Sequence, residues 1–295
     1  MLIVAAGLLA RSFFNTLRRP LGFDTSKPVL TLFVIDKGPG NRVYAGVEEM
    51  AARLRALPGV TRAAYCRRTA FSGSGDGATR DVSIPSRVAA LGMELLRLRY
   101  NQVSVDFLAV SGTRLLAGRG FTPADMDSGA RVVLVNQTMA NRFWPDRSPI
   151  GHSILVDQHA TTVVGVVEDT VISQVHEAPE PFMVLPFGQM PTGELTFLLE
   201  TAGPPEAVLG PARRELSQSG SLVLVQATTL AQQFRDALYE DRMPALLCAI
   251  MGLLGIVLAS AGLFGVVLHR VNRAARETAV RMALGARVGT IMGSV

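Results

Sequence analysis

ALLCAIMGLLGIVLASAGLFGVVL, residues 245–268, is a run of 24 residues without a charged side chain. At about 1.5 Å of rise per residue, a helix of this length crosses a hydrocarbon core about 30 Å thick. The alternative is a helix buried in a soluble core, but soluble helices of this length usually keep a polar face. The stretch therefore predicts a transmembrane helix over residues 243–269.

Charged residues on the two sides of this span predict its orientation. Before it, basic and acidic residues nearly balance, whereas after it Glu277 is the one carboxylate among several arginines. These arginines are Arg270, Arg273, Arg276, Arg281 and Arg287. Lys and Arg beside a span are preferentially kept in the cytoplasm. Residues 270–295 are thus predicted to be cytoplasmic, and the region before the span to lie outside.

The amino-terminal stretch MLIVAAGLLARSFFNTLRR, residues 1–19, opens on an apolar run that ends at Arg11 and is too short to span a membrane. A signal peptide would require a basic start and a cleavage site of small residues, and neither is evident. We interpret residues 1–19 as the outer end of a truncated transmembrane helix followed by a linker. Arg11, Arg18 and Arg19 run against the charge rule at that position.

Residues 20–242 have the length for one large or two smaller domains with real cores. A strand is expected from Pro28, then a helix capped by Asn41, then a strand from Val60. Short strands and helical pieces follow, before a final series of strand, strand, helix (residues 206–216) and strand. This order predicts an α+β domain, with a split ferredoxin-like part interrupted by a strand-rich insert.

The junction between this domain and the span has helical features. Thr229 and Gln232 form a capping-box pattern, and Leu230 and Phe234 follow at helical spacing. One helix can therefore run from the domain into the membrane, with a hinge at Pro244 as the alternative. Beyond the span, an amphipathic helix is expected, which fits either a lipid-surface anchor or a docking surface for a cytoplasmic partner.

The sequence offers little for catalysis. The four histidines lack metal-ligand spacing, and residues 71–80, FSGSGDGATR, lack the Lys of a phosphate-binding loop. Glu168 and Asp169 are neighbours in a strand, so they should point to opposite faces and end the strand in solvent. We therefore expect no enzyme activity, no cofactor and no metal. The net charge is +5, but the basic residues form no stripe with interleaved aromatic residues. Nucleic acid is therefore not an expected partner.

The cytoplasmic stretch RAARETAVRMALGAR, residues 273–287, is similar to a segment of the MacB-like and FtsX-like permeases of ATP-binding-cassette systems. Thr278 and Ala279 stand where that segment usually has Ile and Gly. Five outer stretches also resemble the periplasmic core of these permeases in order and spacing. They are LGFD at 21–24, GRGFTPAD at 118–125, VNQTMANRFWPDRSPIG at 135–151, VVGVVEDT at 163–170 and FMVLP at 182–186.

The resemblance implies a particular domain organisation, that of the latter half of a duplicated permease. Residues 1–19 would end a truncated helix, and 20–242 would form a MacB-like periplasmic core domain. Residues 243–269 would be the transmembrane helix, and 270–295 a coupling segment that starts an FtsX-like permease domain. Since such units usually have four spans, the chain is expected to be partial. Its expected location is the bacterial inner membrane, with the large domain periplasmic.

The resemblance also implies a function. It is that of a permease subunit in an ABC-type export or mechanotransmission system, which couples a cytoplasmic ATPase to motion of the periplasmic domain. The expected partners are that ATPase subunit, the lipid bilayer, a second permease unit in a dimer and, as an open alternative, a periplasmic protein. The residues expected to contact the ATPase are Arg273, Glu277, Arg281, Met282, Ala283, Leu284, Gly285 and Ala286. The alternatives are a membrane-anchored sensor or scaffold and a nonfunctional fragment.

Overall fold

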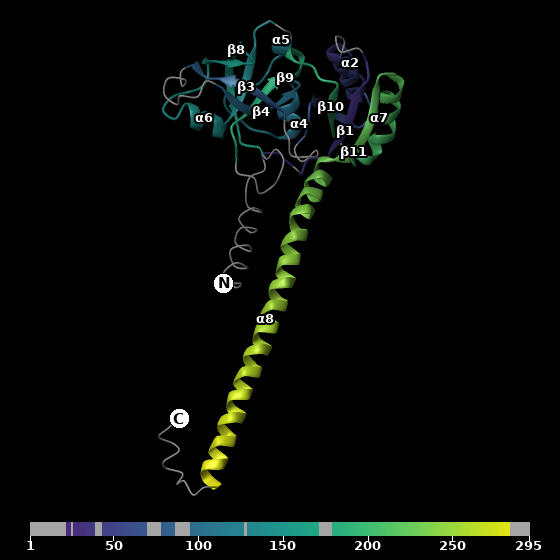
Figure 1. Cartoon of the computed structure of the whole chain (residues 1–295). Helices are drawn as coiled ribbons and strands as arrows, with labels where there is room; N and C mark the ends of the chain where they lie inside the picture. The colour runs from purple at the N-terminus through teal and green to yellow at the C-terminus, as the bar shows by residue number, and fades with distance from the viewer. Residues whose placement is uncertain are drawn as a thin grey trace. The chain divides into compact units, whose positions relative to one another are not determined.

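The computed structural model describes residues 22–24, 26–38, 43–69, 78–85, 95–126, 129–170 and 179–283. The chain divides into two compact units. One unit is Arg18–Tyr239, and the other combines Met1–Leu17 with Glu240–Val295. Each unit is described by itself below, and the elements are labelled in Figure 1.

One half of the unit Arg18–Tyr239 is a four-stranded antiparallel sheet with two helices. Its strand order is β11-β1-β10-β2. The elements are β1 (Val29–Asp36), α2 (Val43–Arg55), β2 (Val60–Cys66), β10 (Glu194–Thr201), α7 (Glu206–Gln218) and β11 (Leu222–Thr229). This order and chain path are those of a ferredoxin-like fold split between its second and third strands, as predicted.

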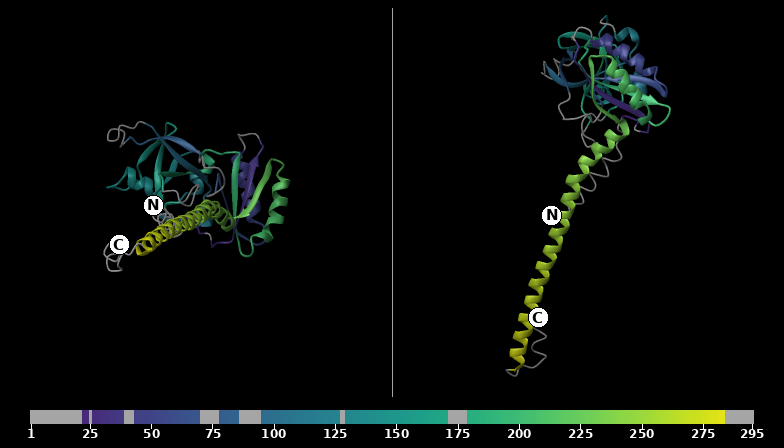
Figure 2. Two further views of the ribbon diagram at one scale, coloured as in Figure 1. Left: turned by 60° about the horizontal axis from the view of Figure 1, so that its bottom comes forward. Right: turned by 90° about the vertical axis from the view of Figure 1, so that its right-hand side faces the viewer.

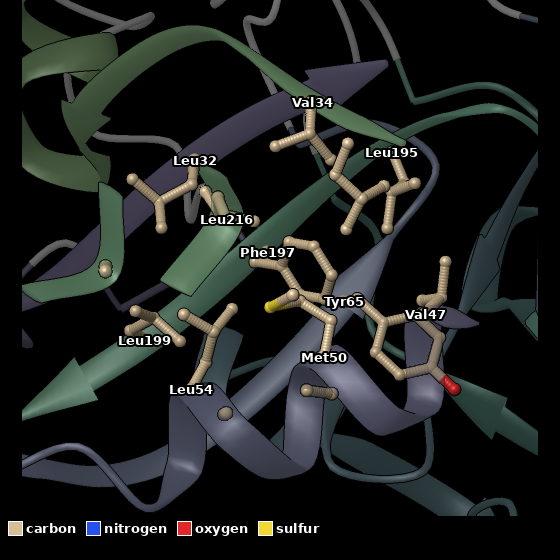
Figure 3. Packing of buried hydrophobic residues seen from close by; sticks show 14 of the residues in the cluster. Leu32, Val34, Val47, Met50, Leu54, Tyr65, Leu195, Phe197, Leu199 and Leu216 are labelled. Carbon is tan, nitrogen blue, oxygen red and sulfur yellow. The ribbon is translucent and has the colours of Figure 1, made fainter. Parts of the chain in front are cut away.

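The two helices of this half bury an apolar stripe on the sheet. Val47, Met50 and Leu54 recur at helical spacing on α2, and each is at most 3% exposed. Their side chains meet alternate residues of the strands, which include Leu32 and Phe197 (Figure 3). Figure 2 shows α7 beside the same part of the sheet. The period of 3.6 in the helices and of 2 in the strands therefore accounts for this core.

The insert between β2 and β10 is a ring of strands. The order β4-β3-β7-β8-β6-β9 is closed by parallel pairing of β4 with β9. Its elements are β3 (Thr79–Ser83), β4 (Leu96–Val103), α4 (Phe107–Ser111), β5 (Leu115–Gly118), α5 (Pro123–Met126), β6 (Val132–Asn136), α6 (Gln137–Phe143), β7 (Ser153–Val156), β8 (His159–Val167), β9 (Phe182–Pro186) and the 3-10 turn η2 (Phe187–Gln189). Closure leaves few unpaired strand edges. The sequence predicts a strand-rich insert but not the closure of its strands into a ring.

A hydrophobic cluster joins the two halves. It includes Ala64 and Leu198 from the ferredoxin-like sheet, and Phe107 and Val184 from the insert. Leu230, the first residue of the last helix, is 3% exposed in the same cluster. The insert is therefore packed onto the sheet face opposite α2 and α7, and does not hang from it as a separate domain.

The last helix, α8, extends over Leu230–Ala283 and runs through Pro244 without a break (Figure 2). Among the described residues it contains the one stretch, Ile250–Arg273, that is long and apolar enough to cross a membrane, with a mean hydropathy of 2.4. The apolar side chains that the structure describes there, such as Leu254 and Phe264, are exposed. The stretch begins five residues later than the predicted apolar run and overlaps it.

Candidate functional site

The predicted ATPase-contact residues lie at the end of α8 and beyond it. Arg273 is in the helix and exposed. Glu277, Arg281, Met282 and Ala283 occupy its last turns, where only the backbone is described, and the calls on Leu284, Gly285 and Ala286 fall outside the described residues. Positions 273, 277 and 281 are spaced by four, so they share one side of α8. Arg276 lies off this line.

The beginning of α8 is bonded to the ferredoxin-like half. The Thr229 hydroxyl accepts from Gln232 N at 3.1 Å, which satisfies one free amide of the first turn. The Gln232 side chain, however, donates to Asp236 at 2.7 Å, so this half of the predicted capping box is wrong. Gln233 donates to the Thr31 hydroxyl on β1 and accepts from the Thr69 hydroxyl. These contacts hold the helix start against β1 and the segment after β2.

The amino-terminal entry into the domain is a short strap, which we define as residues 22–24. Its residues bond to the insert: Asp24 N donates to Ser111 O at 3.0 Å, and Gly22 O accepts from the Thr113 hydroxyl at 3.0 Å. Gly22 has φ +71°, and a Cβ there would lie 2.5 Å from Asp169 O. A glycine is therefore required both by the backbone angle and by the close approach.

The carboxylate of Asp24 closes the turn that follows the strap. It accepts from Ser26 N and from the Ser26 hydroxyl. These hydrogen bonds lower the pKa of Asp24, with a smaller contribution from the charge of Lys27. Lys27 in turn donates to Ala109 O at 2.7 Å, a further bond to α4. The LGFD motif thus works as an anchor and not as a reactive group.

Asn136 and Asp169 form a second node of bonded loops. The Asn136 oxygen accepts from Met139 N and from Phe182 N, and so caps α6 and holds the start of β9. Its amide donates to Asp169 Oδ1 at 2.7 Å. Asp169 also accepts from the backbone and hydroxyl of Thr138. The prediction that Asp169 ends its strand in solvent is wrong, because its carboxylate satisfies buried donors.

Glu168 is likewise bonded. Its carboxylate accepts from Arg114 N and Arg114 Nε, both at 2.9 Å, and its side chain is 13% exposed. The two neighbouring carboxylates thus have separate partners, which agrees with the expectation that they do not form one acid-base pair. Their partners are distant in sequence, so adjacency alone could not reveal them.

The GRGFTPAD motif folds into an ion-pair clamp. Arg119 donates to both oxygens of Asp125, at 2.6 and 3.1 Å, and the backbone and hydroxyl of Thr122 donate to Asp125 Oδ2. The hydrogen bond from Arg119 is the main cause that lowers the pKa of Asp125 to about 2, despite opposition from burial. Gly118, before the clamp, has φ +77° and approaches Val164 O and Gly165.

Metal-ligating and nucleophilic side chains can be located in the part of the chain that the structure describes. Its His, Cys, Asp and Glu residues form no group of three able to hold a metal ion. Cys66 is fully buried, and burial raises the pKa of its thiol, which disfavours the nucleophilic thiolate. Trp144 is buried beside Phe143 in the core of the insert. The motifs described above thus build anchors and clamps.

Comparison with known proteins agrees with this arrangement. Residues 1–240 match the family model of the MacB-like periplasmic core domain. The chain belongs to this family. The periplasmic region of MacB from Actinobacillus actinomycetemcomitans superposes with a TM-score of 0.50 at 14% identity, covering 76% of this chain and 98% of that one. This superposition confirms the fold of the MacB-like domain.

Curated relatives of the family are export permeases. A macrolide export ATP-binding/permease protein, MacB of Chromobacterium violaceum, is 23% identical over 295 aligned positions, which cover 90% of this chain and 44% of the relative. A probable export ATP-binding/permease protein of Pseudomonas fluorescens is 25% identical over 227 positions, with 70% and 34% coverage. The chain thus spans less than half the length of these relatives. It is a MacB-like ABC permease-family protein of the bacterial inner membrane with a periplasmic domain.

Proposed function

We propose that the chain transmits nucleotide-driven motion of a cytoplasmic ABC ATPase to its periplasmic domain, as part of an export or mechanotransmission permease. The observation that carries this proposal is the attachment of the two domain ends to different halves. The strap, residues 22–24, bonds to α4 and to Thr113 just after it, whereas Gln233 near the start of α8 bonds to β1 and Thr69. Relative movement of the two ends would therefore act across the joint between the halves.

The helix itself supports transmission. α8 is continuous from Leu230 to Ala283, so a displacement at its carboxyl end need not be absorbed by a loop. Leu230 is buried in the cluster that joins the halves, and Phe23 of the strap packs against the same cluster. A push or rotation of α8 would thus be felt at a packed core, which shifts between discrete arrangements more readily than it deforms.

The ATPase would bind at the end of α8, on the residues that the family resemblance indicates, with the permease working as a paired unit. The test is co-purification of the chain from bacterial membranes with its ABC ATPase, followed by measurement of ATP hydrolysis. Arg281→Glu and Glu277→Arg reverse charges on the side of α8 shared by positions 273, 277 and 281. We expect each to reduce recovery of the ATPase severalfold, because like charges facing one another oppose association.

The matched control is Arg276→Glu, which makes the same kind of charge change off that line. Recovery of the ATPase should be nearly unchanged with this variant. If Arg281→Glu and Glu277→Arg also leave recovery and ATP hydrolysis unchanged, the coupling proposal is wrong. Loss of a bound periplasmic protein without any change in hydrolysis or export would instead favour the sensor or scaffold alternative.

A further inference from the structure

A polar pocket of about 350 Å³ opens in the periplasmic domain. Its lining comes from four places: Arg67 after β2, Arg80 on β3, Tyr100 and Gln102 on β4, and residues 190–192 after η2. We call this the arginine pocket. The volume lies at the low end of the range for small-molecule sites, so it suits a small ligand or one group of a larger one.

The backbone holds the two arginines in place. Arg67 N donates to Gln102 O at 2.8 Å, and Tyr100 N donates to Ala78 O at 3.0 Å. Arg80 pairs with Leu98 in the β3–β4 register. The site therefore stands on paired strands, which position side chains better than a free loop does.

Both guanidinium groups lie over one aromatic ring. The Arg67 and Arg80 Cζ atoms are 5.6 and 5.2 Å from the ring centroid of Tyr100, which is 8% exposed. Cation–π attraction favours each contact, but two cations at one ring also repel each other. An anion between or beside them would relieve this repulsion.

The positive charge of the arginine pocket is only partly neutralised. Arg80 Nη1 is 2.8 Å from Asp157 Oδ2. Arg67 Nη1 donates to the Tyr100 hydroxyl at 3.4 Å and has no carboxylate partner among the residues that the structure describes. The positive charge of Arg67 is thus not balanced by a carboxylate of the described residues. A local excess of positive charge in a partly enclosed site attracts anions.

Several hydrogen-bonding atoms of the arginine pocket also lack partners within the described chain. They are the Nε atoms of Arg67 and Arg80 and the Oε1 atom of Gln102, which is 1% exposed. The Gln102 amide is oriented by donation to Met190 O. Both Nε atoms are buried without a partner, and a guanidinium binds an oxyanion with two parallel bonds when the ligand enters beside Nε and Nη.

From these observations we propose that the arginine pocket binds the carboxylate or phosphate group of a small molecule that has a short apolar part. Arg67 would be the main anion ligand, because it has no carboxylate of its own, and Arg80 would be the second. Met190 and Pro191 would cover the apolar part. This assignment is independent of the ATPase-coupling proposal, since no residue of the arginine pocket belongs to α8.

The test is isothermal titration of the detergent-solubilised full chain at low salt with three probes. Butyrate presents a carboxylate and inorganic phosphate a phosphate, while butylammonium keeps the apolar part and reverses the charge. We expect at least one anion to bind and butylammonium not to bind. Tighter binding of butyrate would assign a carboxylate ligand, and tighter binding of phosphate a phosphate ligand. Absence of binding by both anions would overturn the proposal.

Variants connect any binding to the arginine pocket. Arg67→Gln should weaken the anion about tenfold or more, which corresponds to one bidentate charged contact. Arg213→Gln, an equal charge change on exposed α7, should leave the affinity unchanged. If Arg67→Gln does not fold, Arg67→Lys is the second variant. It keeps the positive charge but not the paired N–H donors of the guanidinium, so it should lose less anion affinity than is expected for Arg67→Gln. Equal affinity in the wild type and in the folded Arg67 variant would show that the arginine pocket is not the site.

Discussion

The amide of Asn136 donates to the carboxylate of Asp169 over 2.7 Å, and this bond joins the end of β6 to the segment after β8. Because Asn136 also accepts from Met139 N and Phe182 N, one side chain connects three elements of the insert. The residue is 2% exposed, so none of these bonds can be replaced easily by water. The node is therefore expected to be sensitive to small chemical changes.

Replacement of Asn136 by Asp tests this node. The change removes the donor and places a second carboxylate against Asp169, so we expect a loss of about 3 kcal/mol of stability. The measurement is the thermal midpoint of the solubilised chain, followed by near-UV circular dichroism. Asn141→Asp, on the exposed side of α6, should change the midpoint little. Equal midpoints for the two variants would contradict the role assigned to Asn136.

The Arg119–Asp125 clamp predicts a pH dependence. The pKa of Asp125 is about 2 in the folded chain against an ordinary value of 3.8. Because the folded pKa is the lower one, the clamp contributes its full stability above the ordinary value and loses it as the pH falls towards 2. The gap in thermal midpoint between wild type and Asp125→Asn should thus narrow between pH 5 and pH 2. A gap that stays constant would count against the clamp.

Alanine substitutions at two glycines distinguish the cost of backbone strain from the cost of steric crowding. Gly22 and Gly151 both have positive φ, but a Cβ would lie 2.5 Å from Asp169 O at Gly22 and would meet nothing within 4 Å at Gly151. We expect Gly151→Ala to cost about 1 kcal/mol, from the left-handed conformation alone. Gly22→Ala should cost about 3 kcal/mol, because the backbone must also move. The measurement is the thermal midpoint of each variant under the same conditions. Equal losses of stability in the two variants would contradict close packing of the strap.

The buried Cys66 predicts a slow thiol reaction. Burial raises the pKa of its thiol and excludes reagents, so N-ethylmaleimide should modify it only after the domain opens. A Cys248→Ala background leaves Cys66 as the sole thiol of the chain. Mass spectrometry should show little modification at pH 8.5 without denaturant and full modification in urea. Rapid labelling of the native chain would show that the joint between the halves is open.

Much of the fold could be predicted from local pattern. The strand expected from Pro28, the helix expected after Asn41 and the strand expected from Val60 are confirmed by β1, α2 and β2. These elements have strong periodicity and clear breakers, so residues near in sequence suffice to define them. The same holds for the apolar stretch of α8, which depends on composition alone.

The closed ring and the bonded nodes could not be predicted in this way. Ring closure depends on β4 pairing with β9, whose residues lie more than 80 positions apart, as with Arg99 and Phe182. The partners of Asp169 and Glu168 likewise come from segments dozens of residues away. A polar residue at the end of a strand, considered without its tertiary contacts, is predicted to be exposed to solvent. Only the tertiary structure shows that these carboxylates have hydrogen-bond partners.

The candidate site shows the same division. The position of the start of α8 follows from Thr229 and from apolar spacing, and the structure confirms the Thr229 cap. In the sequence the strap is marked only by a motif of family resemblance, because its function depends on how closely Gly22 approaches Asp169. The ATPase-contact residues stay a prediction, since most of that segment lies outside the described residues or has only its backbone described.

The pairing of β1 has a consequence for how the protein is made. Leu30 lies opposite Leu199 on one side and Thr229 on the other, about 170 and about 200 positions later in the chain. During secretion β1 therefore emerges long before either neighbour, and its open edges remain exposed to proteases and to other unfinished chains. Folding of this half has to wait until nearly the whole domain has been exported. Insertion of α8 would then coincide with the moment at which the domain becomes resistant to proteolysis.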